Sequence, residues 1–343
     1  MLISSIKENE PIKKNYVANI NRPKVFFLKK GFFYPKFFSR IVGIVFTPYK
    51  SIIKSWHYND ELSNWSFNKI LSFTLLSYDF FLNKNLLFLA NIFKKKKNII
   101  LKKKDIVLFG AWPHIYYHKL IDFILRINFL KIKKYNKIYL PIFLKKILQS
   151  YPYSKVFSKI NFCYYKYDCK IIFHNLTYVS SLNYFRDNIV LRNCILDLKN
   201  SIKKKINLKS NKYRYSLISR KNATRGLENE DELFLMLKKY KFKRFFFENL
   251  SFLEQIKICY NSEIIVGVQG SGLANLIFMK KNSSLIHLSN IYINNPQVKE
   301  LAISAGINFY DINFSVNRKS SFGGKINVDY VEKKINSIIE TKQ

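Results

Sequence analysis

The chain has 343 residues, 48% of them hydrophobic, and its 59 Lys and Arg residues against 22 Asp and Glu give a formal net charge of +37. This apolar content is enough to bury substantial cores, so it excludes wholesale disorder, and the length favours two α/β domains. The basic excess attracts phosphate groups in nucleotides, nucleic acid or anionic lipid, although an AT-rich genome would also encode a chain so rich in Lys, Asn, Ile, Phe and Tyr. The four cysteines have no CxxC spacing, which argues against a zinc knuckle or a disulfide framework and fits a reducing cytoplasm.

The first hundred residues are basic and aromatic, and their N-terminus has no apolar signal core. The stretch "ILSFTLLSYDFFLNKNLLFLANIF" (70–93) is interrupted by Asp79 and Lys84, so it falls short of the ~20 clean apolar residues that a membrane span needs. We expect this stretch to form surface helices packed on the body of the protein. The basic run at 93–105 marks a boundary, and we treat residues 1–104 as an N-terminal region of unassigned role.

Strand and helix patterns alternate in the next segment, which we take as a Rossmann-like domain over residues 105–208. The sequence predicts strands at 105–110, 137–141, 169–175 and 176–182, and helices at 114–132, 142–151 and 188–206. The polar, turn-rich stretch "NLKSNK" (207–212) is the predicted domain linker.

The alternation is clearer in a second domain over residues 209–343. The sequence predicts strands at 213–220, 242–249, 263–268, 283–289 and 307–312, and helices starting near 229, 251, 272, 296 and 328. Two helix starts carry capping signals, because Asn229 pairs with Glu232 and Ser251 with Glu254 at the spacing of a capping box. Strands and helices that alternate at this spacing predict a parallel sheet, whose ligands bind at the carboxyl ends of the strands.

A glycine-rich turn separates a buried strand from a helix in "EIIVGVQGSGLANLIF" (263–278). Glycines at this position let backbone N–H groups approach a phosphate, and the helix dipole adds partial positive charge. The dinucleotide fingerprint is absent, because Asn275 stands where its third glycine would follow Gly270 and Gly272, and no G-K-[ST] of a Walker A loop follows. The turn is therefore either a phosphate site or a tight connection with no ligand.

Three polar residues end the first strand of the second domain, in "SLISRKNATRGLENEDEL". Ser219, Arg220 and Arg225 would project into the same crevice as the glycine turn. Because the planar guanidinium suits a diphosphate, two arginines and the helix-end amides can neutralise a nucleotide without a metal ion.

A row of polar residues lies on one face of the predicted helix in "WPHIYYHKLIDFILRI", because His114, His118 and Asp122 are spaced four apart and Arg126 extends the row. A His–Asp pair is suited to general-base chemistry on a sugar hydroxyl. Two alternatives remain, a metal site with two His and one Asp, or a helix-capping His beside a satisfied core His.

These features resemble glycosyltransferase family 61, the group of capsular polysaccharide biosynthesis proteins. The family pattern "YHxxxD…R", "SRxxxxRxxxNExE", "LSFxEQ" and "GxHGAGLxNxxF" is similar to "YYHKLIDFILR", "SRKNATRGLENEDE", "LSFLEQ" (with Glu254) and "GVQGSGLANLIF" here, in the same order. The resemblance covers about residues 105 to 289. Two positions depart from it, since Gln269 stands where the family usually has His and Ser271 where it usually has Ala. Gln269 cannot carry charge, so we interpret it as a neutral hydrogen-bond donor.

The resemblance implies an α/β fold of the GT-B type, with two Rossmann-like domains whose parallel sheets face a cleft. It also implies an inverting transferase that uses a nucleotide-sugar donor. On this basis the base is either His118 or Asp122, with His114 and Arg126 beside them. The implied nucleotide-sugar-binding residues are Ser219, Arg220, Arg225, Gln269, Gly270, Ser271, Gly272 and Asn275. We expect no metal or other cofactor, because arginine and the helix dipole would stabilise the leaving group.

The resulting expectation is an enzyme of surface or capsular polysaccharide biosynthesis. It would act on a glycan or lipid-linked glycan acceptor in the cytoplasm, held by its basic region against the anionic inner face of the membrane. Two alternatives remain open. A nucleic-acid-binding protein would explain the charge but not the ordered motifs, and a catalytically inactive protein of the transferase fold would explain Gln269.

Overall fold

The structure is a computed structural model of the chain, and it divides into two compact units, Met1–Lys146 with Lys159–Leu182 and Ile147–Ser158 with Asn183–Gln343. It describes residues 25–28, 31–34, 44–46, 51–53, 98–102, 104–108, 115–130, 135–166, 169–173, 176–179, 188–209, 214–221, 223, 226–290, 296–316 and 323–341. No helix within these ranges is both long and apolar enough to cross a membrane. The apolar stretch 70–93 lies outside them.

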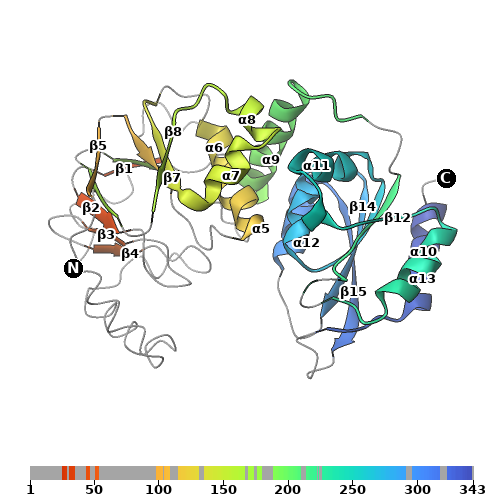
Figure 1. The fold of residues 1–343 in the computed structure, drawn as a ribbon. Helices are drawn as coiled ribbons and strands as arrows, with labels where there is room; N and C mark the ends of the chain where they lie inside the picture. The colour runs from red at the N-terminus through yellow and green to blue at the C-terminus, as the bar shows by residue number, and fades with distance from the viewer. Residues whose placement is uncertain are drawn as a thin grey trace, which may run out of the picture. The chain divides into compact units, whose positions relative to one another are not determined.

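The first unit contains two sheets (Figure 1). In one, β10 (Leu176–Val179), β6 (Ile106–Val107), β7 (Ile138–Pro141) and β8 (Phe162–Tyr165) run parallel in that order, with β1 (Val25–Leu28) antiparallel at the edge. The other sheet has the order β4 (Ser51–Ile53), β3 (Ile44–Phe46), β2 (Gly31–Tyr34), β9 (Lys170–Phe173) and β5 (Asn98–Leu101). Since β1 to β5 come from the region before residue 105, the boundary expected there falls inside this unit.

The predicted helix of the first unit is confirmed, but its middle is a π-helix. It consists of α5 (Tyr116–His118), η2 (Lys119–Ile124) and α6 (Leu125–Leu130) without interruption. Its apolar residues are buried on all sides, among them Leu120, Phe123 and Ile127. The helix is therefore a core helix, buried more completely than an amphipathic pattern predicts. It is followed after β7 by η3 (Ile142–Leu144), α7 (Lys145–Gln149) and α8 (Tyr153–Val156).

The second unit is built on one largely parallel sheet. Its strands are β11 (Tyr215–Ile218), β12 (Lys243–Phe245), β13 (Ile264–Val268), β14 (Ser284–Asn290), β15 (Asn308–Val316) and β16 (Gly324–Lys325). The spatial order is β12-β11-β13-β14-β15-β16, and only β16 is antiparallel to its neighbour. β13, which is apolar throughout, and β14, which also carries polar residues, are buried along their whole length, as central strands of a parallel sheet are. The α/β class with parallel sheets is confirmed.

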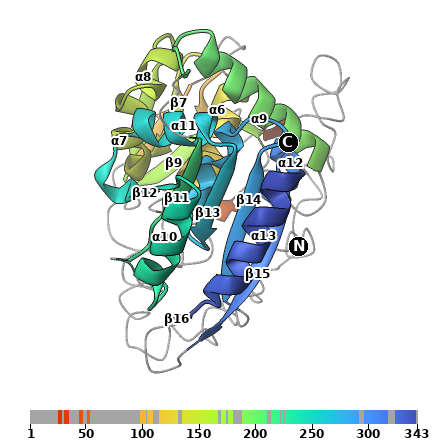
Figure 2. The same cartoon turned by 90° about the vertical axis from the view of Figure 1, so that its right-hand side faces the viewer.

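Helices cover both faces of this sheet (Figures 1 and 2). On one face lie α10 (Glu230–Lys239) and α13 (Val328–Glu340), which share a core with β13, β14 and β15. On the other lie α11 (Phe252–Asn261) and α12 (Gln297–Ala305). The 3₁₀-helix η5 (Ser271–Phe278) packs on both of them, and η4 (Phe247–Asn249) is bound to α11 through Gln255. The helix α9 (Asn188–Lys203) packs on α12 and belongs to this unit, although the predicted linker follows it.

Two local predictions about the helices of this unit need correction. The helix predicted over 272–281 is present, but it is a 3₁₀-helix, η5, and it ends at Phe278. Asn229 occupies the N-cap position of α10 but makes no capping bond, because its amide exchanges two hydrogen bonds of 3.0 Å with the backbone of Ile326. The capping box of Ser251 and Glu254 is confirmed, and the hydrogen bonds from Ser251 lower the pKa of Glu254.

Candidate functional site

The strand order of the second unit creates a switch point between β11 and β13. Their connections leave the sheet toward opposite faces, because α10 follows β11 and η5 follows β13. In sheets of this order, ligands bind in the crevice at the carboxyl ends of the two strands. The residues at those ends are Ser219 and Arg220 after β11, and Gln269 and Gly270 after β13.

The Arg220 side chain lies directly against Gly270. A Cβ added to Gly270 would lie 1.6 Å from Nη1 and 2.7 Å from Cζ of Arg220, so only glycine leaves room for the guanidinium. The structure therefore brings together an arginine and a glycine that are fifty positions apart and that the sequence placed in one site.

The start of η5 presents backbone N–H groups beside Arg220. The bond from the Leu273 amide to the Gly270 carbonyl (3.1 Å) opens the helix, so the amides of Ser271 and Gly272 precede its hydrogen-bond ladder. Amides at a helix start carry partial positive charge and suit an anion. Gly267 has a different role, because a Cβ there would meet Leu273 Cδ2 at 2.8 Å and its place is inside the packed strand.

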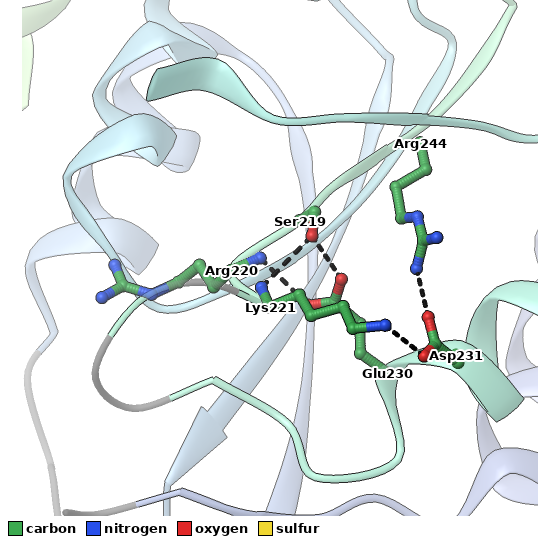
Figure 3. A network of polar contacts seen from close by, with 6 residues as sticks. All are labelled: Ser219, Arg220, Lys221, Glu230, Asp231 and Arg244. Carbon is green, nitrogen blue, oxygen red and sulfur yellow. Dashed lines mark hydrogen bonds and ion pairs between the residues drawn. The ribbon is translucent and has the colours of Figure 1, made fainter. Parts of the chain in front are cut away.

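Ser219 and Arg220 are held by Glu230, the first residue of α10 (Figure 3). The Ser219 hydroxyl donates to Glu230 Oε1, and the Arg220 amide donates to Glu230 Oε2 at 2.9 Å. Ser219 Oγ also accepts the Lys221 amide at 3.2 Å. The Ser219 hydroxyl, 3% exposed, thus supports the turn from inside the protein. Sequence reasoning missed Glu230, because the acidic run "NEDE" reads as a capping signal.

The next carboxylate of α10 has different partners. Asp231 accepts hydrogen bonds from Lys221 Nζ and, at 2.6 Å, from Arg244 Nη1, and these bonds lower the pKa of its carboxyl. Arg244 also lies over the Phe234 ring, 4.4 Å from its centroid. Figure 3 shows the Arg220 side chain extending away from both Glu230 and Asp231.

Asn275 and Gln255 form a buried support beneath the turn. Asn275 is fully buried, and its Nδ2 donates to Gln255 Oε1 at 3.0 Å and to the Gly272 carbonyl at 3.3 Å. Gln255 Nε2 in turn donates to the carbonyls of Phe247 and Leu250. These bonds fix η5 on α11, so we assign Asn275 to the support of the turn rather than to ligand contact.

Gln269 continues the ladder between β13 and β14, with its amide donating to the Leu288 carbonyl at 3.0 Å. Its Oε1 is buried and accepts no hydrogen bond from the residues that the structure describes. Gln269 therefore brings an unused acceptor to the turn. Arg225 and His114, two other predicted site residues, lie outside the described ranges.

In the first unit, His118 and Asp122 form a buried pair. His118 Nδ1 and Asp122 Oδ2 are 2.6 Å apart, and the two residues are 6% and 5% exposed. A π-helix holds more residues per turn than an α-helix, so η2 places residues four apart more nearly above one another. Because Nδ1 faces the carboxylate, proton transfer by this ring would use its other nitrogen, Nε2.

Arg126 completes the predicted row on this helix. It is fully buried, its Nε donates to the Asp122 carbonyl, and its Cζ lies 5.2 Å from the centroid of the Phe123 ring. No group of three or more His, Cys, Asp or Glu side chains in the described part of the chain is arranged to hold a metal ion.

Comparison with known proteins places these features in one family. Residues 116–286, about half of the chain, match the family model described as Glycosyltransferase 61. The chain is similar to the EGF domain-specific O-linked N-acetylglucosamine transferase of Drosophila melanogaster (34% identity over 101 residues, 29% of this chain and 19% of that protein) and of Mus musculus (30% over 87 residues, 24% and 16%). It thus spans less than a fifth of the length of these relatives. The matched range contains the His118–Asp122 pair, Arg220 and the Gly270 turn, and the chain belongs to glycosyltransferase family 61.

Proposed function

We propose that this protein is a glycosyltransferase that moves a sugar from a nucleotide-sugar donor to a glycan acceptor. The observation that carries the proposal is the position of the Arg220 guanidinium against Gly270, beside the leading amides of η5. In glycosyl transfer, negative charge develops on the departing diphosphate. A planar guanidinium and backbone N–H groups fixed at that point stabilise the charge as it forms. Leaving-group stabilisation without a metal ion is part of this proposal.

His118 is the proposed base. In a single displacement the acceptor hydroxyl oxygen attacks the anomeric carbon, and the bond from that carbon to the diphosphate breaks. The hydroxyl proton passes to His118 Nε2, and the electron pair leaves with the nucleoside diphosphate, so the anomeric configuration inverts. Asp122, 2.6 Å from Nδ1, orients the ring and stabilises the imidazolium. A GT-B arrangement of the two units belongs to the same proposal.

The proposed setting is surface or capsular polysaccharide biosynthesis in the cytoplasm, with peripheral contact to the inner face of the membrane. The net charge of +37 supports attraction to anionic lipid. Flotation with anionic vesicles at low and high salt tests the setting. We expect salt-sensitive binding, and an absence of binding at low salt would remove the membrane from the proposal.

The nucleotide site is tested by a thermal-shift screen against UDP, GDP, CMP and dTDP and their sugars, with RNA as a control. The relatives' name makes N-acetylglucosamine the first donor sugar to try. At 100-fold over Kd, a ligand adds about 2.7 kcal/mol to the unfolding free energy, which gives a clear shift.

We expect one nucleoside diphosphate to stabilise the protein selectively, and Arg220→Ala to abolish the shift. Arg214→Ala is the matched control, because it also removes one positive charge from this unit but lies in an exposed ion pair with Glu263. A salt-sensitive shift with RNA alone would identify a nucleic-acid-binding protein. Selective nucleotide binding without turnover on any glycan acceptor would identify an inactive transferase fold.

A further inference from the structure

Glu230 is a carboxylate buried where strand β11 turns toward α10, with 1% of its surface exposed. Burying an ionised carboxylate costs several kcal/mol unless hydrogen bonds compensate. The hydrogen-bond partners of Glu230 therefore indicate its structural role. Both partners belong to the turn: the Ser219 hydroxyl binds Oε1, and the Arg220 amide binds Oε2 at 2.9 Å. The position at the first residue of α10 also places the charge at the favourable end of the helix dipole.

We propose that Glu230 is a positioning residue that acts through Arg220. By fixing the backbone of residues 219 and 220, its carboxylate sets the point from which the Arg220 side chain reaches Gly270. This inference rests on the proposed function, in which Arg220 binds the diphosphate of the donor.

Positioning matters here because an arginine side chain has many rotamers, and ordering it on binding costs affinity. The guanidinium lies so close to Gly270 that a single added Cβ would collide with it. The Ser219 hydroxyl and the Arg220 amide, both bound to the Glu230 carboxylate, hold the start of the Arg220 side chain in this place before the ligand arrives. Loss of Glu230 would therefore lower anion affinity although Glu230 itself touches no ligand.

Asp231 provides a matched comparison within the same helix turn. It is also a carboxylate with two hydrogen-bond partners, but these are the basic side chains of Lys221 and Arg244, and Asp231 is exposed to solvent. Removing its charge leaves the two bonds of Glu230 to residues 219 and 220 in place.

The test measures affinity for inorganic pyrophosphate by calorimetry in a double-mutant cycle of Glu230→Ala and Arg220→Ala, with Asp231→Asn as the control. We expect Glu230→Ala to weaken binding about tenfold in the wild-type background. In the Arg220→Ala background the same change should have no further effect, since Glu230 acts through Arg220. Glu230→Gln keeps one acceptor and the side-chain shape, so it should restore part of the affinity and serves if the alanine variant does not fold.

Hydrogen exchange of residues 214–221 in the unliganded protein gives a second readout, and we expect the Arg220 amide to exchange faster in both Glu230 variants but not in Asp231→Asn. The positioning role would be overturned if Glu230→Ala lowered pyrophosphate affinity equally in the wild-type and Arg220→Ala backgrounds. It would also be overturned if the Arg220 amide exchanged at an unchanged rate in the Glu230 variants. If instead Arg220→Ala itself leaves pyrophosphate affinity unchanged, the proposed nucleotide site is wrong, and this inference is overturned with it.

Discussion

At Gly270 the requirement for glycine is one of space and not of backbone conformation. Its φ of 179° is extended backbone that any residue adopts, whereas Gly306, with φ of 74°, ends α12 in the left-handed region. The atoms that a Gly270 side chain would meet belong to Arg220, the far end of a flexible side chain. A larger residue at position 270 therefore displaces the Arg220 guanidinium and leaves the backbone fold unchanged.

Gly270→Ala should weaken nucleotide binding while leaving the stability of the protein almost unchanged. We expect the unfolding free energy to change by less than about 1 kcal/mol, because Arg220 can rotate away. Affinity for the nucleoside diphosphate should fall about tenfold, because the guanidinium loses its charge-assisted hydrogen bonds. Calorimetry and chemical denaturation measure the two quantities. In an Arg220→Ala background the added methyl group should cost no further affinity, and an equal loss there would show that Gly270 acts independently of Arg220.

At the scale of elements, β13 could be predicted because its apolar run Ile264–Val268 is buried whole, whereas the two-residue strand β16, where no strand was predicted, has no such run. The capping box of Ser251 and Glu254 could be predicted because both partners are local. The role of Asn229 could not be predicted, because its side-chain amide binds the backbone of Ile326. A local sequence pattern does not include a partner 97 positions away. Glu230 was missed for the same reason, because its role depends on the turn that it meets in the folded sheet.

The contact between α9 and the end of η5 predicts a pH dependence. Lys199 Nζ donates to the Met279 carbonyl at 2.6 Å, and burial, followed by the charge of Lys203, lowers the pKa of Lys199 to about 8. An unfolded lysine keeps a pKa near 10.4, so between these values the unfolded chain binds more protons and stability rises with pH. From pH 8 to 10.5, the unfolding free energy of the wild-type protein should rise by on the order of 2 kcal/mol relative to that of Lys199→Met.

Urea denaturation of both proteins across that pH range measures the difference between their unfolding free energies. The contributions of the other titrating groups are the same in both proteins and cancel in this difference. The charge is most costly below pH 8, where Lys199 is protonated in both the folded and the unfolded state. Parallel stability curves for the two proteins would mean that the Lys199 ammonium is as well solvated in the folded state as in the unfolded chain.

For the whole molecule, the sequence located the candidate residues but not the limits of the units. The motifs are local, so spacing and the family resemblance together made His118, Asp122, Arg220 and Gly270 candidates. The apolar face of α9 predicts a packed helix but does not say which unit it packs on, and in the structure that partner is α12. The proposed base therefore belongs to one unit and the proposed nucleotide turn to the other.

This division predicts opposite behaviour for variants in the two units. His118→Ala should reduce transfer about a hundredfold or more while leaving nucleoside diphosphate affinity unchanged, because the base acts on the acceptor proton. Arg220→Ala should lower both the affinity for the nucleoside diphosphate and the rate of sugar transfer. Asp122→Asn keeps the shape of the pair and removes the charge that stabilises the imidazolium, so its transfer rate should also fall with affinity retained. Steady-state transfer assays beside calorimetry separate the cases. A His118→Ala protein that transfers sugar at the wild-type rate would remove His118 as the base, while loss of nucleotide affinity in that variant would mean that His118 contributes to the donor site.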